Sequence, residues 1–133
     1  MKPILKLVTP IFFLFLPTLA GAQVLGPADF DRGLKREKGI LVDVRTPEEY
    51  QAEHIEGAMN INVMSPDFVQ KLEALDKRRS YFVYCGIGKR SAKAVATMKE
   101  AGFKKVYGLE KGLEEWKNKG FPTQKAAGPP YEE

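Results

Sequence analysis

The chain has 133 residues, with 21 Lys and Arg against 17 Asp and Glu, which gives a net charge of +4. This small excess, without a basic stripe interleaved with aromatic residues, argues against a nucleic-acid-binding protein. One cysteine and one histidine do not form a clustered ligand set, so we expect no metal site and no cofactor.

Residues 1–22 predict a cleaved export signal. Lys2 and Lys6 precede an apolar run over residues 7–19, and the small residues Ala-Gly-Ala then supply a cleavage site before Gln23. The run is shorter than the ~20 residues of a membrane span and is interrupted by Pro10 and Pro17, so no membrane anchor is expected. We therefore expect a periplasmic or secreted protein of 111 residues with a net charge of +2.

Strand and helix patterns alternate along the rest of the chain. Strands are expected at residues 24–25, 40–44, 58–63, 81–84 and 106–107. Helices are expected at residues 27–38, 66–75, 91–101 and 109–119. A further short helix is expected to begin at Pro47, with Thr46 as its N-cap.

The expected strands are apolar on both sides, which is typical of strands buried between two layers of helices. This pattern predicts a single-domain, doubly wound α/β fold with a mainly parallel sheet of about five strands and helices on both faces. We expect this domain over residues 23–124 and a disordered tail over residues 125–133.

The only cysteine, Cys85, ends the apolar strand at 81–84 and begins a six-residue loop, 85–90, before the next helix. Ligands of parallel sheets bind at the carboxyl ends of the strands, which is where this cysteine falls. Converging backbone N–H groups and a helix dipole stabilise a thiolate there. A lone cysteine in an exported protein lacks an internal disulfide partner, so we expect a reactive thiol rather than a buried apolar one.

The rest of the loop favours binding of a small anion. Gly86 and Gly88 allow the backbone to turn N–H groups inward around Ile87. Lys89 and Arg90 add positive charge for the approach of an anion and for a leaving group. For Arg90, a structural ion pair with a neighbouring carboxylate is expected equally with a role in anion binding.

Four sequence blocks, taken together, resemble the rhodanese-like domain family. They are residues 43–50, residues 54–61, the pattern Cys85-x-x-Gly-x-Arg-Ser, and the pattern Gly112-x-x-x-Trp-x-x-x-Gly-x-Pro. The resemblance covers nearly all of the chain after residue 22, and single-domain exported members are most similar. It implies a sulfurtransferase in which Cys85 takes sulfane sulfur from an anionic donor such as thiosulfate, holds it as a persulfide, and passes it to a thiol or cyanide-like acceptor.

Three other functions remain open on the residues alone. A related group with this fold hydrolyses phosphate esters, but its loop has one more residue between cysteine and arginine. Some rhodanese-like domains are non-enzymatic binding modules, and these have often lost the cysteine. A persulfide carrier for a protein partner uses the same first half-reaction. The oligomeric state and the physiological donor and acceptor do not follow from the sequence.

The other polar residues in these blocks favour structural roles. Asp43 ends a strand and is expected to cap the following turn. Arg45 and Glu49 are four residues apart and are expected to pair across a short helix. His54 is expected to be a hydrogen-bonded structural residue rather than a general base. Lys111 lies where the resembled family often has a second glycine. The resemblance therefore implies added charge in a loop near the mouth of the substrate pocket.

Overall fold

The computed structural model describes residues 2–4, 6, 10–11 and 23–125. Most of the predicted export signal and all of the predicted tail beyond Lys125 lie outside the described residues. Within the described part of the chain, no helix has the length and apolar character needed to cross a membrane.

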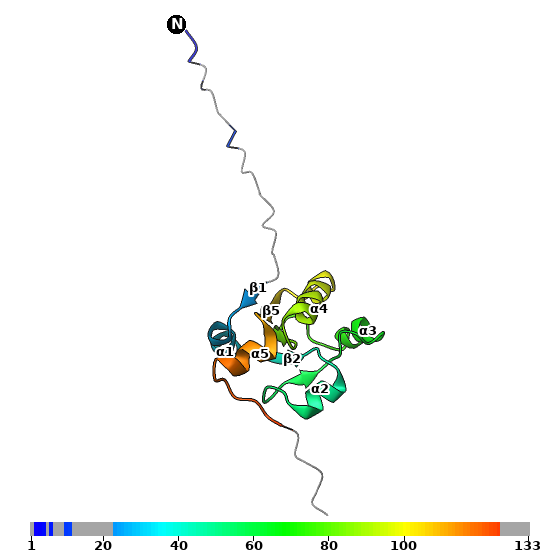
Figure 1. Ribbon diagram of the computed structural model, residues 1–133. Helices are drawn as coiled ribbons and strands as arrows, with labels where there is room; N and C mark the ends of the chain where they lie inside the picture. Colours follow the sequence, from blue (N-terminus) through cyan, green and yellow to red (C-terminus); the bar gives the residue numbers. More distant parts are fainter. Residues whose placement is uncertain (1, 5, 7–9, 12–22, 126–133) are drawn as a thin grey trace, which may run out of the picture.

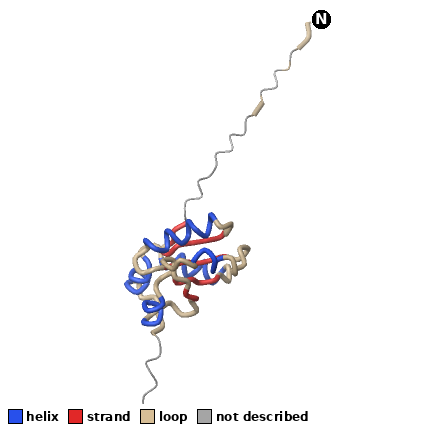
Figure 2. Tube along the Cα trace, turned by 90° about the vertical axis from the view of Figure 1, so that its right-hand side faces the viewer, coloured by secondary structure: helices blue, strands red, loops and turns tan. Residues whose placement is uncertain are grey.

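Five parallel strands form the centre of the domain, and helices lie on either side of them (Figures 1 and 2). The strands are β1 (Gln23–Leu25), β2 (Ile40–Asp43), β3 (Met59–Asn60), β4 (Ser80–Tyr84) and β5 (Lys105–Leu109). The helices are α1 (Pro27–Arg36), α2 (Pro47–Ala52), α3 (Phe68–Leu72), α4 (Lys89–Glu100) and α5 (Gly112–Asn118). The strand order is β1-β5-β4-β2-β3, and all neighbouring strands are parallel. The predicted single α/β domain with about five strands is confirmed.

The central strand β4 is buried along its whole length because helices cover both of its faces. Tyr81 and Val83 belong to the core cluster that includes side chains of α3 and α4. Phe82 and Tyr84 belong to the opposite cluster, with side chains of α1 and α5. Phe30 of α1 meets the Phe82 ring edge-on, with 5.3 Å between the ring centroids. The strand therefore alternates between two apolar layers, which explains its uninterrupted apolar sequence.

Helix α4 begins two residues earlier than predicted. Gly88 is its N-cap, with φ of 103°, and Lys89 is its first residue. This left-handed conformation favours glycine, so the chain turns at Gly88 and enters the helix at once. Lys89 and Arg90, predicted as loop residues, consequently lie in the first helical turn.

The predicted helix at residues 109–119 also begins at a different place. Strand β5 continues to Leu109, and α5 begins only at Gly112. Lys111 and Gly112 both have positive φ, of 55° and 61°, which makes a sharp turn between strand and helix. The predicted strand at 58–63 is reduced to β3, because only two of its residues pair with β2.

Candidate active site

Cys85 directly follows β4, at the carboxyl end of the sheet, and only 1% of its surface is exposed. Its Sγ accepts a hydrogen bond from the N–H of Gly88 at 3.1 Å. The thiol also lies 3.4 Å from Oγ of Ser91 and donates to it, while the Ser91 hydroxyl donates to the Gly88 carbonyl at 3.1 Å. A backbone N–H and a rotatable hydroxyl therefore both lie at the sulfur, where they can stabilise negative charge.

The cysteine loop, residues 85–88, is held by the N-terminus of α5. The N–H of Leu113 donates to the carbonyl of Cys85 at 2.8 Å, and the N–H of Glu114 donates to the carbonyl of Gly86 at 3.1 Å. A trans peptide directs its N–H away from its carbonyl, so the N–H groups of Gly86 and Ile87 point away from α5. The loop thus presents backbone donors on one side because α5 binds its acceptors on the other.

Gly112 allows this close approach. A Cβ at this position would lie 2.5 Å from the Cys85 carbonyl oxygen and 2.6 Å from the Gly86 carbonyl carbon. Gly88 is similarly constrained, because a Cβ there would lie 3.3 Å from the backbone nitrogen of Lys111. The turn before α5 and the cysteine loop are therefore packed directly against each other.

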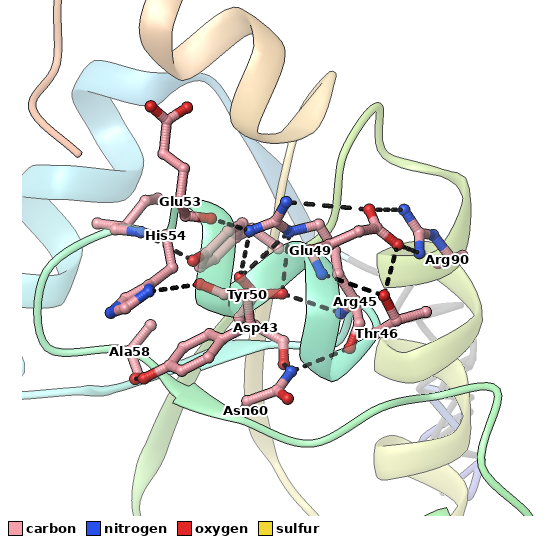
Figure 3. Close-up of polar contacts among 12 residues, drawn as sticks. Asp43, Arg45, Thr46, Glu49, Tyr50, Glu53, His54, Ala58, Asn60 and Arg90 are labelled. Atoms are coloured by element: carbon pink, nitrogen blue, oxygen red, sulfur yellow. Dashed lines mark hydrogen bonds and ion pairs between the residues drawn. The ribbon is translucent and has the colours of Figure 1, made fainter. Parts of the chain in front are cut away.

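Arg90 projects from α4 toward Glu49 of α2 (Figure 3). Its two terminal nitrogens donate to the two carboxylate oxygens of Glu49 at 2.7 and 2.9 Å. Chiefly through this hydrogen bonding, Arg90 lowers the pKa of Glu49 to about 2. The pKa of Arg90 is raised, chiefly by Glu49 and to a smaller extent by the charges of Cys85 and Asp43. Arg90 is thus bound to a carboxylate of another helix, which is one of the two roles expected for it.

The expected pair between Arg45 and Glu49 is present but loose, with 3.9 Å between Nη1 and Oε2. The main partner of Arg45 is Asp43, which is fully buried and accepts from the Arg45 backbone N–H at 2.9 Å and from Nη2 at 2.9 Å. The guanidinium also donates to the carbonyl of Glu53, and the Asn60 amide donates to the carbonyls of Asp43 and Arg45. These contacts give Asp43 the structural role expected from the sequence.

His54 packs on α2. Its Nδ1 lies 2.7 Å from the carbonyl oxygen of Tyr50, and the two rings stack with 3.8 Å between centroids. Its backbone N–H and carbonyl pair with Gln124 near the end of the described chain. These contacts support the structural role expected for this residue.

The structure brings Cys85, Gly86, Ile87 and Gly88 into one loop and places the two basic residues, Lys89 and Arg90, where α4 begins. Ile87 is 58% exposed and Lys89 is exposed, so both lie at the surface of the site.

Sequence reasoning missed two residues at this site. The sequence predicts Ser91 as the first residue of a helix, yet the structure places its hydroxyl in contact with the sulfur. Its position directly after the Cys-x₄-Arg spacing was the available signal. Sequence distance predicts Arg45 as the partner of Glu49, but its stronger partner, Arg90, is 41 residues away. Among the described residues, no group of three or more His, Cys, Asp or Glu side chains is arranged to hold a metal ion.

The structure is a parallel α/β domain with a cysteine in a glycine-containing loop at a helix N-terminus, an arrangement suited to holding an anion beside a thiol. Residues 26–119 match the family described as the rhodanese-like domain, and the chain belongs to this family.

Relatives and solved structures agree with this assignment. The chain is 31% identical over 105 residues to the thiosulfate sulfurtransferase GlpE of Pseudomonas fluorescens, and the match covers 78% of this chain and 93% of that protein. It is 34% identical over 79 residues to YrkF of Bacillus subtilis, named as a putative sulfur carrier protein; the match covers 59% of this chain and 42% of YrkF. A rhodanese-related protein from Thermoplasma volcanium has a similar structure, with a TM-score of 0.69 and 27% identity, over 77% of this chain and 97% of that one.

Proposed function

We propose that this protein is a sulfurtransferase of the thiosulfate type that carries sulfane sulfur on Cys85. The observation that supports this most is the environment of Sγ, which accepts the N–H of Gly88 and lies beside Ser91 Oγ. A buried sulfur with donors fixed around it suits a transient anionic persulfide. The 12-residue helix α4 begins at this loop and adds the positive end of its dipole.

The first half-reaction is a displacement at sulfur. The Cys85 thiolate attacks the outer sulfur of thiosulfate, an S–S bond forms at the cysteine, and the S–S bond of thiosulfate breaks. Sulfite leaves with the electron pair, and the loop N–H groups with Lys89 stabilise its charge. In the second half-reaction, a thiol or cyanide-like acceptor attacks the outer sulfur of the persulfide and releases the Cys85 thiolate. No external oxidant or reductant takes part.

Intact-mass analysis after incubation with thiosulfate tests this function. The wild-type protein should gain the mass of one sulfur atom, and cyanide should reverse the gain. Cys85→Ser should show no gain while retaining the circular dichroism spectrum of the wild type, because a serine hydroxyl does not hold a persulfide. A wild-type protein that never gains sulfur from thiosulfate would refute the proposed sulfurtransferase function, and phosphate-ester hydrolysis by the same protein would favour the phosphatase alternative.

A persulfide carrier that serves a protein acceptor is the second candidate, favoured by the similarity to YrkF. Both functions load Cys85 in the same way, so the second half-reaction distinguishes them. Fast release to cyanide and small thiols supports the enzyme. A stable persulfide that small acceptors do not remove would support the carrier. A binding module without chemistry would show neither reaction.

We also propose that the protein is exported, with residues 1–22 removed before Gln23. The lysines, the apolar run and the small residues before Gln23 support this proposal. N-terminal sequencing of the protein from the expressing cells tests it. A product that retains residues 1–22 in a membrane fraction would contradict it.

A further inference from the structure

Lys111 adopts a backbone conformation that side chains rarely take. Its φ is 55°, and Lys38 is the only other described non-glycine residue with positive φ. Glycine adopts this conformation without steric cost, so the turn before α5 does not itself require a lysine. Because this conformation is unfavourable for a lysine and lies next to the cysteine loop, it leads to the hypothesis that the Lys111 side chain has a function there.

Lys111 packs against the cysteine loop at Gly88. Its backbone N and Cα would lie 3.3 and 3.6 Å from a Cβ on Gly88, and the N–H of Gly88 is the donor to Cys85 Sγ. Lys111 is exposed and lies with Ile87 between two hollows at the surface. The backbone of Lys111 is therefore packed on the cysteine loop, and its exposed side chain lines both hollows.

The first hollow, of about 190 Å³, has mainly apolar walls from α4, β5 and β1. Ser91, which contacts the sulfur, and Val95 line it from α4, and Leu109 and Val24 line it from the strands. The second hollow, of about 200 Å³, is bordered by Ile87, Lys111 and two glutamates of α5. A short organic chain fits this combination of apolar wall and charged rim better than a bare inorganic anion does.

Lys111 is the only basic residue among the described residues that line these two hollows. Glu110 lines the first hollow, and Glu114 and Glu115 line the second. Glu115 is 3.8 Å from Lys119, so its charge is partly neutralised. The Lys111 ammonium therefore offsets part of the acidic charge at these rims and is the one positive group there that can bind an anion among the described residues.

We propose that Lys111 makes the site selective for small organic thiols that carry a carboxylate and act as sulfur acceptors. The ammonium binds the carboxylate while the organic chain contacts the apolar side of Ile87. The acceptor thiolate attacks the outer sulfur of the Cys85 persulfide; that S–S bond breaks, Cys85 leaves as a thiolate, and the acceptor departs as a persulfide. This inference rests on the proposed function, because it concerns how the persulfide on Cys85 is discharged.

A discharge experiment with three matched thiols tests the inference. The full protein is first loaded with thiosulfate and freed of excess donor. It is then mixed with 3-mercaptopropionate, 2-mercaptoethanol or 2-aminoethanethiol, and the loss of sulfur is followed by intact mass. Each rate is compared between the wild type and Lys111→Gln, so that differences in intrinsic thiol reactivity cancel. The variant should discharge to the carboxylate thiol on the order of fivefold more slowly. The rate with the neutral thiol should be unchanged, and the rate with the amine should rise.

Two further variants separate charge from backbone effects. Lys111→Gly should raise the melting temperature by relieving the positive φ, yet it should show the same slower discharge to 3-mercaptopropionate. Lys38→Gln, at the other positive-φ lysine, should leave all three rates unchanged. Equal changes with all three thiols in Lys111→Gln, or no change, would overturn the inference. A wild-type protein that does not load sulfur would refute the sulfurtransferase function, and this inference with it.

Discussion

Arg90 at the start of α4 and Glu49 in α2 form a two-point ion pair, although 41 residues separate them in sequence. Figure 3 shows Glu49 between the guanidinium groups of Arg45 and Arg90, with Thr46 beside it. The Thr46 side chain also accepts from the N–H of Glu49 and caps α2. The ion pair therefore connects the helix that follows the cysteine loop to a helix on another part of the sheet.

Glu49→Gln should lower the stability of the fold in a pH-dependent way. The pKa of Glu49 is about 2 in the folded protein, against an ordinary value of 4.5. Its contribution is therefore fully present above pH 4.5 and is lost as the pH falls toward 2. The side chain is 38% exposed, so solvent screening reduces the effect to about 1 kcal/mol, or a few degrees in melting temperature.

Thermal melts of the wild type and Glu49→Gln between pH 2 and 7 measure this contribution. The difference in melting temperature should be largest at neutral pH and should shrink below pH 4.5. The neighbouring exposed Glu48 provides the control, because Glu48→Gln should change little at any pH. A Glu49→Gln difference that grows on acidification would contradict the assignment.

Ser91→Ala should slow persulfide formation while preserving the fold. The Ser91 hydroxyl lies 3.4 Å from Sγ and can rotate to donate to a thiolate. Loss of one such hydrogen bond to a charged group costs about 1.5 kcal/mol, or roughly tenfold in rate. Single-turnover loading with thiosulfate, followed by intact mass, measures the change. An unaltered loading rate would show that the Ser91 hydroxyl serves only the Gly88 carbonyl.

Lys89→Ala should weaken the use of thiosulfate more than the use of a neutral sulfane-sulfur donor. Thiosulfate is a dianion, and its leaving group is also anionic, so an exposed ammonium at the first turn of α4 assists both. We expect a loss of roughly threefold to tenfold for thiosulfate, which should diminish as salt rises.

Lys93, one turn further along α4 and also exposed, provides the matched control for Lys89. Lys93→Ala should change thiosulfate turnover much less. Equal losses for both donors in Lys89→Ala would indicate that the side chain shapes the loop rather than supplying charge.

Gly112→Ala should disrupt both the fold and sulfur transfer. Its Cβ would overlap the Cys85 carbonyl oxygen at 2.5 Å, in addition to the strain of a φ of 61°. We expect a loss of roughly 3 kcal/mol in the free energy of unfolding. Gly120 also has positive φ, of 81°, but a Cβ added there would meet no other described atom within 4 Å. Gly120→Ala should therefore show the conformational cost alone, about 1 kcal/mol, with sulfur transfer retained.

His54→Ala should lower the melting temperature more than it lowers the rate per folded molecule. The ring stacks on Tyr50 and binds its carbonyl, and these contacts join α2 to the chain that follows it. Parallel melts and sulfur-transfer assays distinguish the two effects. A variant that melts normally but has lost activity would identify His54 as a participant in the chemistry.

The parallel sheet was predictable because its signals are local in sequence. Buried strands are continuously apolar. A proline directly after an N-cap residue, as in Thr46-Pro47, marks a helix start. The place of Cys85 followed from the same pattern, since a cysteine after an apolar strand of such a sheet falls at its carboxyl edge.

The remaining details of the site depend on contacts between distant segments. Arg90 pairs with Glu49 because the packing of α2 beside α4 brings them together, and no spacing rule encodes that pairing. Helix α5 begins at Gly112 because the turn must bring the N–H of Leu113 within hydrogen-bonding distance of the Cys85 carbonyl. This is a requirement of tertiary structure. The late start of α5 could not be read from helical periodicity for the same reason.

The alternation along β4 also determines the direction in which the thiol points. Cys85 falls on the same side as Tyr81 and Val83 and shares their core cluster, while Phe82 and Tyr84 face the other way. Since side chains alternate with a period of two, a shift of β4 by one residue against β2 and β5 would turn the sulfur toward the α1 and α5 layer. Sulfur-transfer activity therefore reports on strand alignment: a variant that retains the sheet in a shifted register would lose its chemistry while keeping its secondary structure.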